Sequence, residues 1–567
     1  MSDTTGDAMK YHRWKKNYKY GIQRMLNIKV GKKILIIRNN NTMKLYAREF
    51  KNISLAIVSA LICFTNVVNA QRPNSAAKPR IIITADPELD DNNSMIRFLM
   101  YASDVNIEGL IYTSSQFHWK GDGKGTRWFV PGREYARFGL DTCPCTSWRW
   151  GKDERFIDDI VDAYTKVYPN LNLHNPNYPS PDVLKSKVRF GNIEFDGDFS
   201  KNTPGSDLIK SLILDNKPGK LFITAWGGQS TIARALKAIQ EEYENTTEWD
   251  AIKKKISNKV VLLPSGDQDN TYPKYIKPNW PGIEYRQFSS GPNYGYGAQL
   301  RAKPEDSIYL TTAWMKENIS DRGPLGKLYR VWGDGKQMAE GDKMDYFGIA
   351  GHTDDELRKM GYVVWMPVQA KGSWLGEGDD GTFMNVLGNG LRAWEEPSYG
   401  GWGGRTITTQ STGDFFTMSD TSQQAMVSAL SSMNNNANTY PNFFPAAQND
   451  FAIRMKWSVT PKYADANHAP VITIENPLNV LASPGETIRL NSNVTDPDKN
   501  KVAVKWWQCM VGTYHNTVTI ANTNMQQAKV TVPKDAVAGQ TIHIVVEATD
   551  SGLPSLTTYQ RIIITVK

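Results

Sequence analysis

The sequence predicts an α/β domain with an open, mainly parallel sheet and flanking helices, followed by an all-β, immunoglobulin-like sandwich. From about residue 78 to residue 457, strand-like apolar runs alternate with segments of helical periodicity. This alternation is typical of a parallel sheet covered by helices. After residue 467, short strands with alternating apolar residues follow one another, as in sandwich domains. We therefore predict a leader at 1–70, an α/β domain at 71–463 and a sandwich at 467–567.

The expected strands of the α/β domain are apolar runs that end in glycine or polar residues. In chain order they lie at 80–86, 107–115, 220–228, 258–269 and 361–368. Amphipathic helices are expected at 93–103 and 229–243, directly after the first and third of these strands. Because ligands bind at the carboxyl ends of the strands in such sheets, the polar strand ends predict where the site lies.

The sandwich is expected to hold about seven short strands in about 100 residues. They lie at 471–475, 487–494, 501–508, 517–522, 528–532, 541–549 and 561–566. Side chains alternate between the two faces of a strand, so Trp506 and Trp507 point in opposite directions. One is expected in the core, and the other is either exposed or at a domain interface.

The basic charge of the chain belongs to its first 70 residues. The chain has 66 Lys and Arg against 58 Asp and Glu, a net charge of +8. The leader holds 13 of the basic and 3 of the acidic residues, so the remainder has a net charge of −2. Basicity therefore gives no reason to expect a nucleic-acid partner for the rest of the chain.

The end of the leader has the pattern of a secretory signal peptide. Lys44, Arg48 and Lys51 precede an uncharged apolar stretch at about 53–67, and small residues lead to Ala70. We predict cleavage after Ala70 and a secreted or periplasmic protein without a stable membrane span. An uncleaved membrane anchor is the alternative.

Three cysteines follow the predicted cleavage site. Cys143 and Cys145 are separated by one proline, a spacing that we interpret as too short for an easy disulfide, and Cys509 lies in the sandwich. An odd number of cysteines fits no complete disulfide framework. We expect all three to be structural or free thiols.

Acidic residues cluster where the first strand ends. Asp86, Asp90 and Asp91 follow RIIITA within six positions, and carboxylates at this density repel one another unless a cation lies among them. Carboxylate and carbonyl oxygens suit Ca²⁺, and a bound cation lowers the pKa of a coordinated water. The alternative is that the acids only stabilise the first turn of the following helix.

The stretch ITADPELDDNNSMIRFLMYA resembles the N-terminal signature of the nucleoside hydrolases. The resemblance implies that Asp86 and Asp91 bind Ca²⁺ and that Asp90 contacts sugar hydroxyls. One of the two ligating carboxylates would act as the base for the attacking water. The sequence departs from the signature at Thr84, where the family has aspartate, and at Glu88, where it has glycine.

Two further stretches carry the same resemblance. FITAWGGQSTIARAL is similar to a family strand in which the residue at Trp226 gives its carbonyl oxygen to the calcium ion. In WLGEGDDGTFMNVLGNGLRAW, Asp379 best fits the late calcium ligand and Asp380 is a rival. Gly378 stands where the family often has the histidine that assists the departing base.

Several residues are candidates for contacts with the substrate. Gln116 or His118 would replace a family asparagine that follows the second strand, and Asp269 is available as a polar group at another strand end. Aromatic rings stack on sugars, so we also consider Trp119, Trp226, Trp374 and Trp402, with core packing as the alternative.

A closer resemblance combines these pieces. TADPELDDNNS, AWGGQST, GDQDNTYPKYIKPNWPGIEY, GEGDDGTFMNVLGNGL and YGGWGGR are similar to the secreted bacterial family related to the cellulose-binding protein Sde182. It joins a nucleoside-hydrolase-like domain to a C-terminal sandwich. The resemblance implies a carbohydrate-related role.

These observations lead to two hypotheses about function. The first is a secreted, calcium-dependent hydrolase of an N-ribosyl or related sugar bond, with a sugar-containing small molecule or a polysaccharide as its partner. The second is a non-catalytic protein that binds cellulose or another polysaccharide with the former active-site cleft and the sandwich. Gly378 favours the second hypothesis, whereas the three aspartates favour the first.

Overall fold

The computed structural model describes residues 78–136, 143–287, 294–405 and 441–567. The leader and its predicted cleavage site lie outside these described residues. Within the described ranges, no helix has the length and apolar character needed to cross a membrane.

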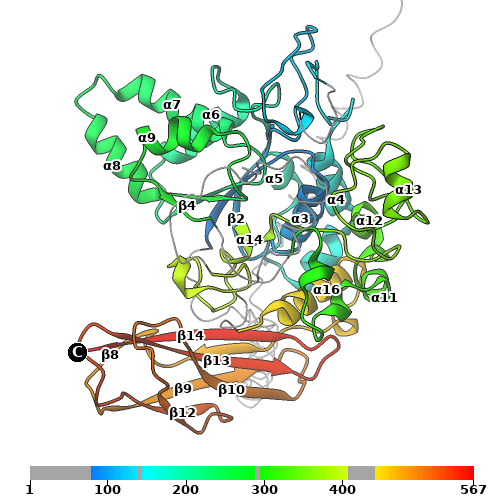
Figure 1. Cartoon of the computed structure of the whole chain (residues 1–567). Helices are drawn as coiled ribbons and strands as arrows, with labels where there is room; N and C mark the ends of the chain where they lie inside the picture. The colour runs from blue at the N-terminus through cyan, green and yellow to red at the C-terminus, as the bar shows by residue number, and fades with distance from the viewer. Residues whose placement is uncertain (1–77, 137–142, 288–293, 406–440) are drawn as a thin grey trace, which may run out of the picture. The chain divides into compact units, whose positions relative to one another are not determined.

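A six-stranded parallel sheet forms the centre of the α/β domain (Figure 1). The strand order is β3-β2-β1-β4-β5-β6, and every neighbouring pair is parallel. The strands are β1 (Arg80–Ala85), β2 (Asn106–Tyr112), β3 (Val188–Phe190), β4 (Leu221–Ala225), β5 (Val260–Pro264) and β6 (Glu284–Tyr285). The predicted open parallel sheet is confirmed.

Helices cover both faces of this sheet because the central strand β1 is apolar on both sides. Ile81 and Ile83 belong to a core with α3 (Leu89–Met100), α4 (Phe156–His174) and α16 (Phe444–Val459). Ile82 packs in a second core with α6 (Pro204–Leu214), α7 (Ser230–Tyr243) and α8 (Trp249–Lys259). Shorter helices are α5 (Pro181–Lys185), α9 (Lys277–Asn279), α10 (Ala298–Arg301), α11 (Thr312–Met315), α12 (Gly323–Leu328), α13 (Asp354–Lys359) and α14 (Asp380–Met384).

The prediction of a strand at 361–368 is wrong. This apolar run is buried but irregular, and it packs in a separate hydrophobic cluster. Its backbone bonds to a segment about 20 residues earlier and not to a strand. Val363 N–H donates to the carbonyl of Lys343 at 3.0 Å, and Met366 N–H donates to the Tyr346 hydroxyl at 2.7 Å. A short apolar run indicates burial, but it does not by itself specify a sheet partner.

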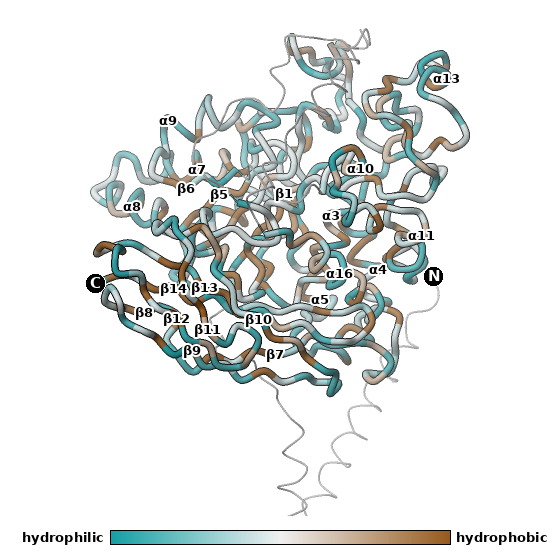
Figure 2. The backbone as a smooth tube through the Cα atoms, turned by 60° about the horizontal axis from the view of Figure 1, so that its bottom comes forward, coloured by the Kyte–Doolittle hydropathy of each residue, from teal (hydrophilic) through white to brown (hydrophobic). Residues whose placement is uncertain are grey.

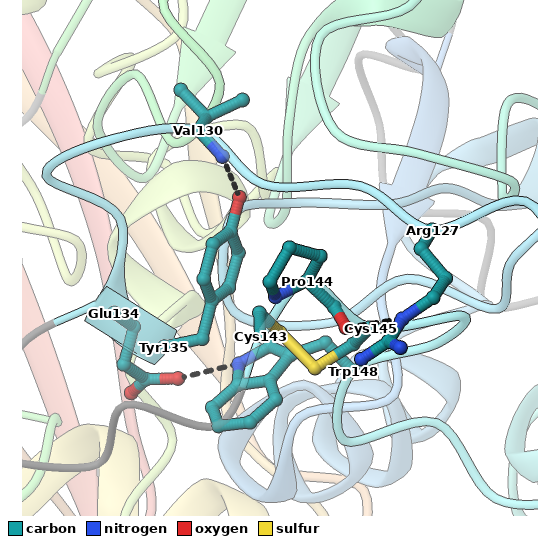
Figure 3. The surroundings of a disulfide bond; sticks show 8 residues. All are labelled: Arg127, Val130, Glu134, Tyr135, Cys143, Pro144, Cys145 and Trp148. Carbon is teal, nitrogen blue, oxygen red and sulfur yellow. Dashed lines mark hydrogen bonds between the residues drawn. A yellow bond between two sulfur atoms is a disulfide. The ribbon is translucent and has the colours of Figure 1, made fainter.

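The expectation of free thiols at Cys143 and Cys145 is wrong, because the two residues form a disulfide (Figure 3). The Cys-Pro-Cys turn brings their Cα atoms to 4.4 Å, at the short end of the range that a disulfide spans. Arg127 Nε donates to the carbonyl of Pro144 at 2.8 Å beside it. Cys509 is a buried free thiol, as expected.

The C-terminal part of the described chain is a sandwich of two four-stranded sheets, ordered β10-β13-β14-β8 and β11-β12-β9-β7. The strands are β7 (Val471–Ile474), β8 (Asn479–Ala482), β9 (Thr487–Thr495), β10 (Val502–Cys509), β11 (Thr519–Ala521), β12 (Gln527–Thr531), β13 (Thr541–Asp550) and β14 (Thr557–Val566). The sequence prediction missed only β8. Figure 2 shows the hydrophobic stretches of β13 and β14, which supply much of the core.

The two tryptophans of β10 lie on opposite faces, which confirms the prediction. Trp506 is buried in the sandwich core, and its indole N–H donates to the carbonyl of Met525 at 2.9 Å. Trp507 is partly buried against the core of the α/β domain. The sandwich therefore contacts the α/β domain through the sheet that contains β10.

Gly390 makes a close contact between the α/β domain and β14. Its φ is +89°, and a Cβ atom there would lie 1.7 Å from the carbonyl oxygen of Tyr559. Its own carbonyl accepts a hydrogen bond from Arg561 N–H at 3.0 Å. Neither the conformation nor the spacing allows a side chain.

We expect Gly390→Ala to lower the free energy of unfolding by about 3 kcal/mol, because backbone strain and overpacking act together. Chemical denaturation measures the change. Gly388→Ala is the matched control, since a Cβ atom there meets nothing within 4 Å and stability should change by less than about 1 kcal/mol. Equal stability of the two variants would contradict this account of the contact.

Candidate metal and sugar site

The acidic cluster lies at the carboxyl end of β1, which is the central strand of the sheet. Asp86 directly follows the strand, and Asp90 and Asp91 lie in the first turn of α3. The helix begins at Leu89, four residues earlier than the sequence predicted. Asp90 and Asp91 therefore occupy a helix N-terminus, which favours negative charge, and they also face the strand-end site.

Asp86 is completely buried, and neither of its carboxylate oxygens has a hydrogen-bond partner. Asp91 is 1% exposed, and its Oδ1 accepts a hydrogen bond from the backbone N–H of Asp86 at 3.0 Å. Burial of an unpaired carboxylate is costly. The oxygens of Asp86 are therefore well suited to bind a cation.

The neighbouring carboxylates disfavour each other's charge. Burial, followed by repulsion from Asp379 and Asp86, raises the pKa of Asp91 well above its usual range. Burial and repulsion from Asp90 do the same for the pKa of Asp379. The pKa of Asp90 is raised to about 6, mainly by burial. A cation among these groups would remove the repulsion and favour their ionised forms.

His118 and Glu88 complete the cluster. His118 Nδ1 lies 3.7 Å from Asp86 Oδ2 and 4.0 Å from Glu88 Oε2. Ligand atoms lie within 4.8 Å of one another in two sets of three, Asp86 with Glu88 and His118, and Glu88 with Asp90 and Asp91. His118 was a sequence candidate for the site, whereas Glu88 was noted only as a departure from the family pattern.

Tyr296 and Gly378 define the surroundings of Asp90. The Tyr296 hydroxyl donates to Asp90 Oδ1 at 3.1 Å, a contact that the sequence did not indicate. A Cβ atom at Gly378 would lie 2.1 Å from Asp90 Oδ2. In this conformation the Asp90 carboxylate lies where a side chain at position 378 would be.

Asp379 and Asp380 have different surroundings. Asp380 is paired with the buried guanidinium of Arg97, whose Nε lies 2.9 Å from Asp380 Oδ2. Asp379 is 2% exposed, and its Oδ2 has no hydrogen-bond partner. Repulsion from Asp90 and Asp86 contributes to the raised pKa of Asp379, which indicates that its carboxylate lies close to theirs.

The backbone of Trp226 reaches the site, but its side chain does not. The residue follows β4, and its indole N–H donates to Thr382 Oγ1 at 2.8 Å. The ring packs against Phe98 and Phe383 in the core. Its carbonyl oxygen accepts a hydrogen bond from the side-chain amide of Gln268, and a carbonyl has a second lone pair for a metal ion.

Gln116 follows β2 and Asp269 follows β5, and the loops that carry them are in contact. Gln116 is buried, and its backbone N–H donates to the carbonyl of Gln268 at 3.0 Å. Asp269 accepts hydrogen bonds from Ser230 N–H at 2.9 Å and Thr271 N–H at 3.0 Å. These contacts show that Asp269 anchors the start of α7. Gln268, which the sequence prediction omitted, lies between Asp267 and Asp269 in the strand-end motif that indicated the site.

The four tryptophans considered for sugar stacking are all buried. Trp119, Trp226 and Trp374 are 0% exposed, and Trp402 is 3% exposed. Trp119 packs against Phe195 and Trp128 in a small separate cluster, while Trp374 and Trp402 belong to the main core. Their surroundings match the alternative of core packing, so we give none of these rings a stacking role.

The parallel sheet with buried aspartates after its first strand agrees with the nucleoside-hydrolase-like fold that the sequence resembles. The sequence matches the family described as cellulose-binding Sde182, nucleoside hydrolase-like domain, over residues 80–406. Residues 487–566 match the C-terminal domain of cellulose-binding protein Sde0182. The chain therefore belongs to the Sde182 nucleoside-hydrolase-like family. No curated protein matches the sequence.

Among solved structures, the chain is similar to a nucleoside hydrolase-related hypothetical protein from Saccharophagus degradans that is associated with carbohydrate metabolism. The identity is 23%, the TM-score is 0.61, and the match covers 86% of this chain and all of the other. The likeness shows a shared fold. A fragment of the outer capsid protein Hoc from bacteriophage RB49 matches 17% of this chain and 30% of its own, with 13% identity and a TM-score of 0.13.

Proposed function

We propose that the protein is a secreted, calcium-dependent hydrolase that cleaves an N-ribosyl or related sugar bond. The observation that carries this proposal is the buried Asp86, whose two oxygens have no hydrogen-bond partner and lie beside Asp91 and Asp379. Carboxylates that are mutually repulsive and unpaired in a strand-end site are the chemistry that a hard cation satisfies.

The donor set fits Ca²⁺. Asp86, Asp91, Asp379 and the carbonyl of Trp226 would hold the ion, and all four provide the oxygen ligands that calcium prefers. The pairing of Asp380 with Arg97 supports Asp379 as the late ligand. When bound, calcium would lower the pKa of a coordinated water.

The remaining polar side chains support binding of a sugar. Asp90, oriented by Tyr296, would accept hydrogen bonds from sugar hydroxyls, and His118 and Gln116 lie at the next strand end. Asp86 or Asp91 would accept the proton of the attacking water. Gly378 has no side chain and therefore supplies no group that could protonate a departing base.

The absence of a proton donor at position 378 favours the second candidate function, in which the protein binds a polysaccharide such as cellulose without cleaving it. The family to which the chain belongs is described as cellulose-binding. The two candidates share the cation site and differ in whether a bond is broken. One set of assays therefore tests both.

We expect the protein to release sugar from a panel of nucleosides and oligosaccharides in the presence of Ca²⁺ but not with a chelator. Asp91→Asn should lower the rate about 10²–10⁴-fold, as expected for loss of a base and metal ligand. Asp465→Asn, which changes an exposed aspartate outside the site, should leave the rate unchanged.

Two outcomes would contradict the proposal. Release of sugar that is insensitive to the chelator would exclude the calcium requirement. No turnover on any substrate, together with retention on insoluble cellulose, would exclude the hydrolase and support the binding protein.

A further inference from the structure

A pocket of about 380 Å³ is lined by residues at the start of α16 and by residues of the sandwich sheet that contains β10, β13 and β14. It is distinct from the acidic cluster, since its lining shares no residue with that site. Its volume is in the range of roughly 300–1,000 Å³ that is usual for small-ligand sites, which often lie at domain interfaces.

Aromatic side chains from both domains form the apolar part of the pocket. Phe443 precedes α16, Trp507 lies on β10, and Tyr559 lies on β14. The ring centroids of Phe443 and Tyr559 are 5.4 Å apart, and those of Phe443 and Trp507 are 6.5 Å apart. Phe443 and Tyr559 are buried members of the main core, whereas Trp507 is only partly buried. Trp507 is therefore the aromatic side chain that is accessible from the pocket.

Polar groups border the same pocket. Lys505 and Glu547 are directly opposite each other on β10 and β13, and both line it. Burial raises the pKa of Glu547, while the charge of Lys505 acts in the opposite direction. The two charges are of opposite sign, so together they offer donors and acceptors without attracting either anions or cations strongly.

Aromatic faces beside a neutralised pair of polar side chains match the chemistry of a neutral sugar. The apolar C–H face of a pyranose ring packs on an aromatic ring, and its hydroxyls bond to the polar groups.

We propose that this pocket is a second, non-catalytic binding site for the end of a neutral, β-linked glucan chain, with Trp507 as its main contact. The inference rests on the polysaccharide-binding role proposed above, but not on hydrolysis or on calcium. The site would hold a polymer at the domain junction while the acidic cluster acts independently.

Titration of the full chain with cellohexaose tests the proposal by calorimetry. We expect Trp507→Ala to weaken binding about tenfold or more, as for an aromatic residue at the centre of a binding site. Trp249→Ala is the matched control, because Trp249 is also partly exposed but lies on α8 against a different core. It should bind cellohexaose like the wild type.

Lys505→Ala provides a second variant that is expected to fold, because Lys505 is exposed. It should weaken cellohexaose binding a few-fold and leave the melting temperature unchanged. Wild-type affinity in both pocket variants would overturn the proposal, as would tighter binding of an acidic oligogalacturonide than of cellohexaose.

Asp91→Asn separates this proposal from the hydrolase. The variant should lose calcium-dependent sugar release and keep its affinity for cellohexaose. Loss of cellohexaose binding in Asp91→Asn, with retention in Trp507→Ala, would place the glucan in the acidic cluster and overturn the second site. Loss of hydrolysis alone would leave the pocket proposal supported.

Discussion

Replacing Asp379 with asparagine is expected to stabilise the calcium-free protein and to abolish its stabilisation by calcium. Asp379 is buried, and its charge is opposed by Asp90 and Asp86. Removing one of several repelling carboxylates should raise the free energy of unfolding of the calcium-free protein by about 1–2 kcal/mol. The same change removes a proposed ligand, so the variant should no longer respond to the ion.

Thermal denaturation with Ca²⁺ and with a chelator measures both effects. Calcium at 100 times its dissociation constant should stabilise the wild type by about 2.7 kcal/mol. Asp465→Asn should respond to calcium like the wild type. A calcium response of normal size in Asp379→Asn would remove this residue from the ligand set.

Stabilisation of the protein by calcium is expected to increase as the pH rises. The folded-state pKa of Asp90 is about 6, above its ordinary value of 3.8, so the folded, calcium-free protein holds this proton more tightly than the unfolded chain. The contribution of Asp90 to stability is therefore lost as pH rises from about 4 to 6. Calcium competes with protons at the cluster, so its stabilising effect should grow over the same interval.

The sequence predicted the parts of the site that depend on local pattern. Asp86, Asp90 and Asp91 follow one strand and enter one helix, so their proximity follows from a short stretch of chain. The parallel sheet was predictable for the same reason, because its strands are separate apolar runs with polar ends. The strand order of the sheet then brings the carboxyl ends of β1, β2, β4 and β5 together on the same side of the sheet.

Contacts between distant segments were not predictable from the sequence. Tyr296 reaches Asp90 across more than 200 positions, and no local pattern marks such a hydroxyl as part of the site. The buried ring of Trp226 illustrates the same limit, since only the packed structure shows that it points into the core while its carbonyl faces the strand end.

Arg97 lies behind the acidic cluster and connects it to the core of the domain. Its side chain is 0% exposed, and its Nε lies 2.6 Å from Glu377 Oε2 and 2.9 Å from Asp380 Oδ2. The guanidinium also lies 4.0 Å from the ring centroid of Phe451 on α16. One cation thus neutralises two buried carboxylates in the segment that leads into α14 and carries Asp379.

We expect Arg97→Met to lower the free energy of unfolding by about 3–5 kcal/mol, because it leaves Glu377 and Asp380 buried without their cation. Chemical denaturation with chelator present measures this loss separately from calcium binding. Arg155→Met is the control, since Arg155 forms only exposed ion pairs with Asp159 and Asp162, which contribute about 0–1 kcal/mol.

A second change tests the cause of that loss. Adding Asp380→Asn to Arg97→Met removes one of the two uncompensated charges, so the double variant should be more stable than Arg97→Met alone. If Arg97→Met costs less than about 1 kcal/mol, or if Asp380→Asn adds to its cost, the buried carboxylates do not depend on Arg97 for their charge. The position of Asp379 beside the cluster would then have to be maintained by packing of α14 rather than by this ion pair.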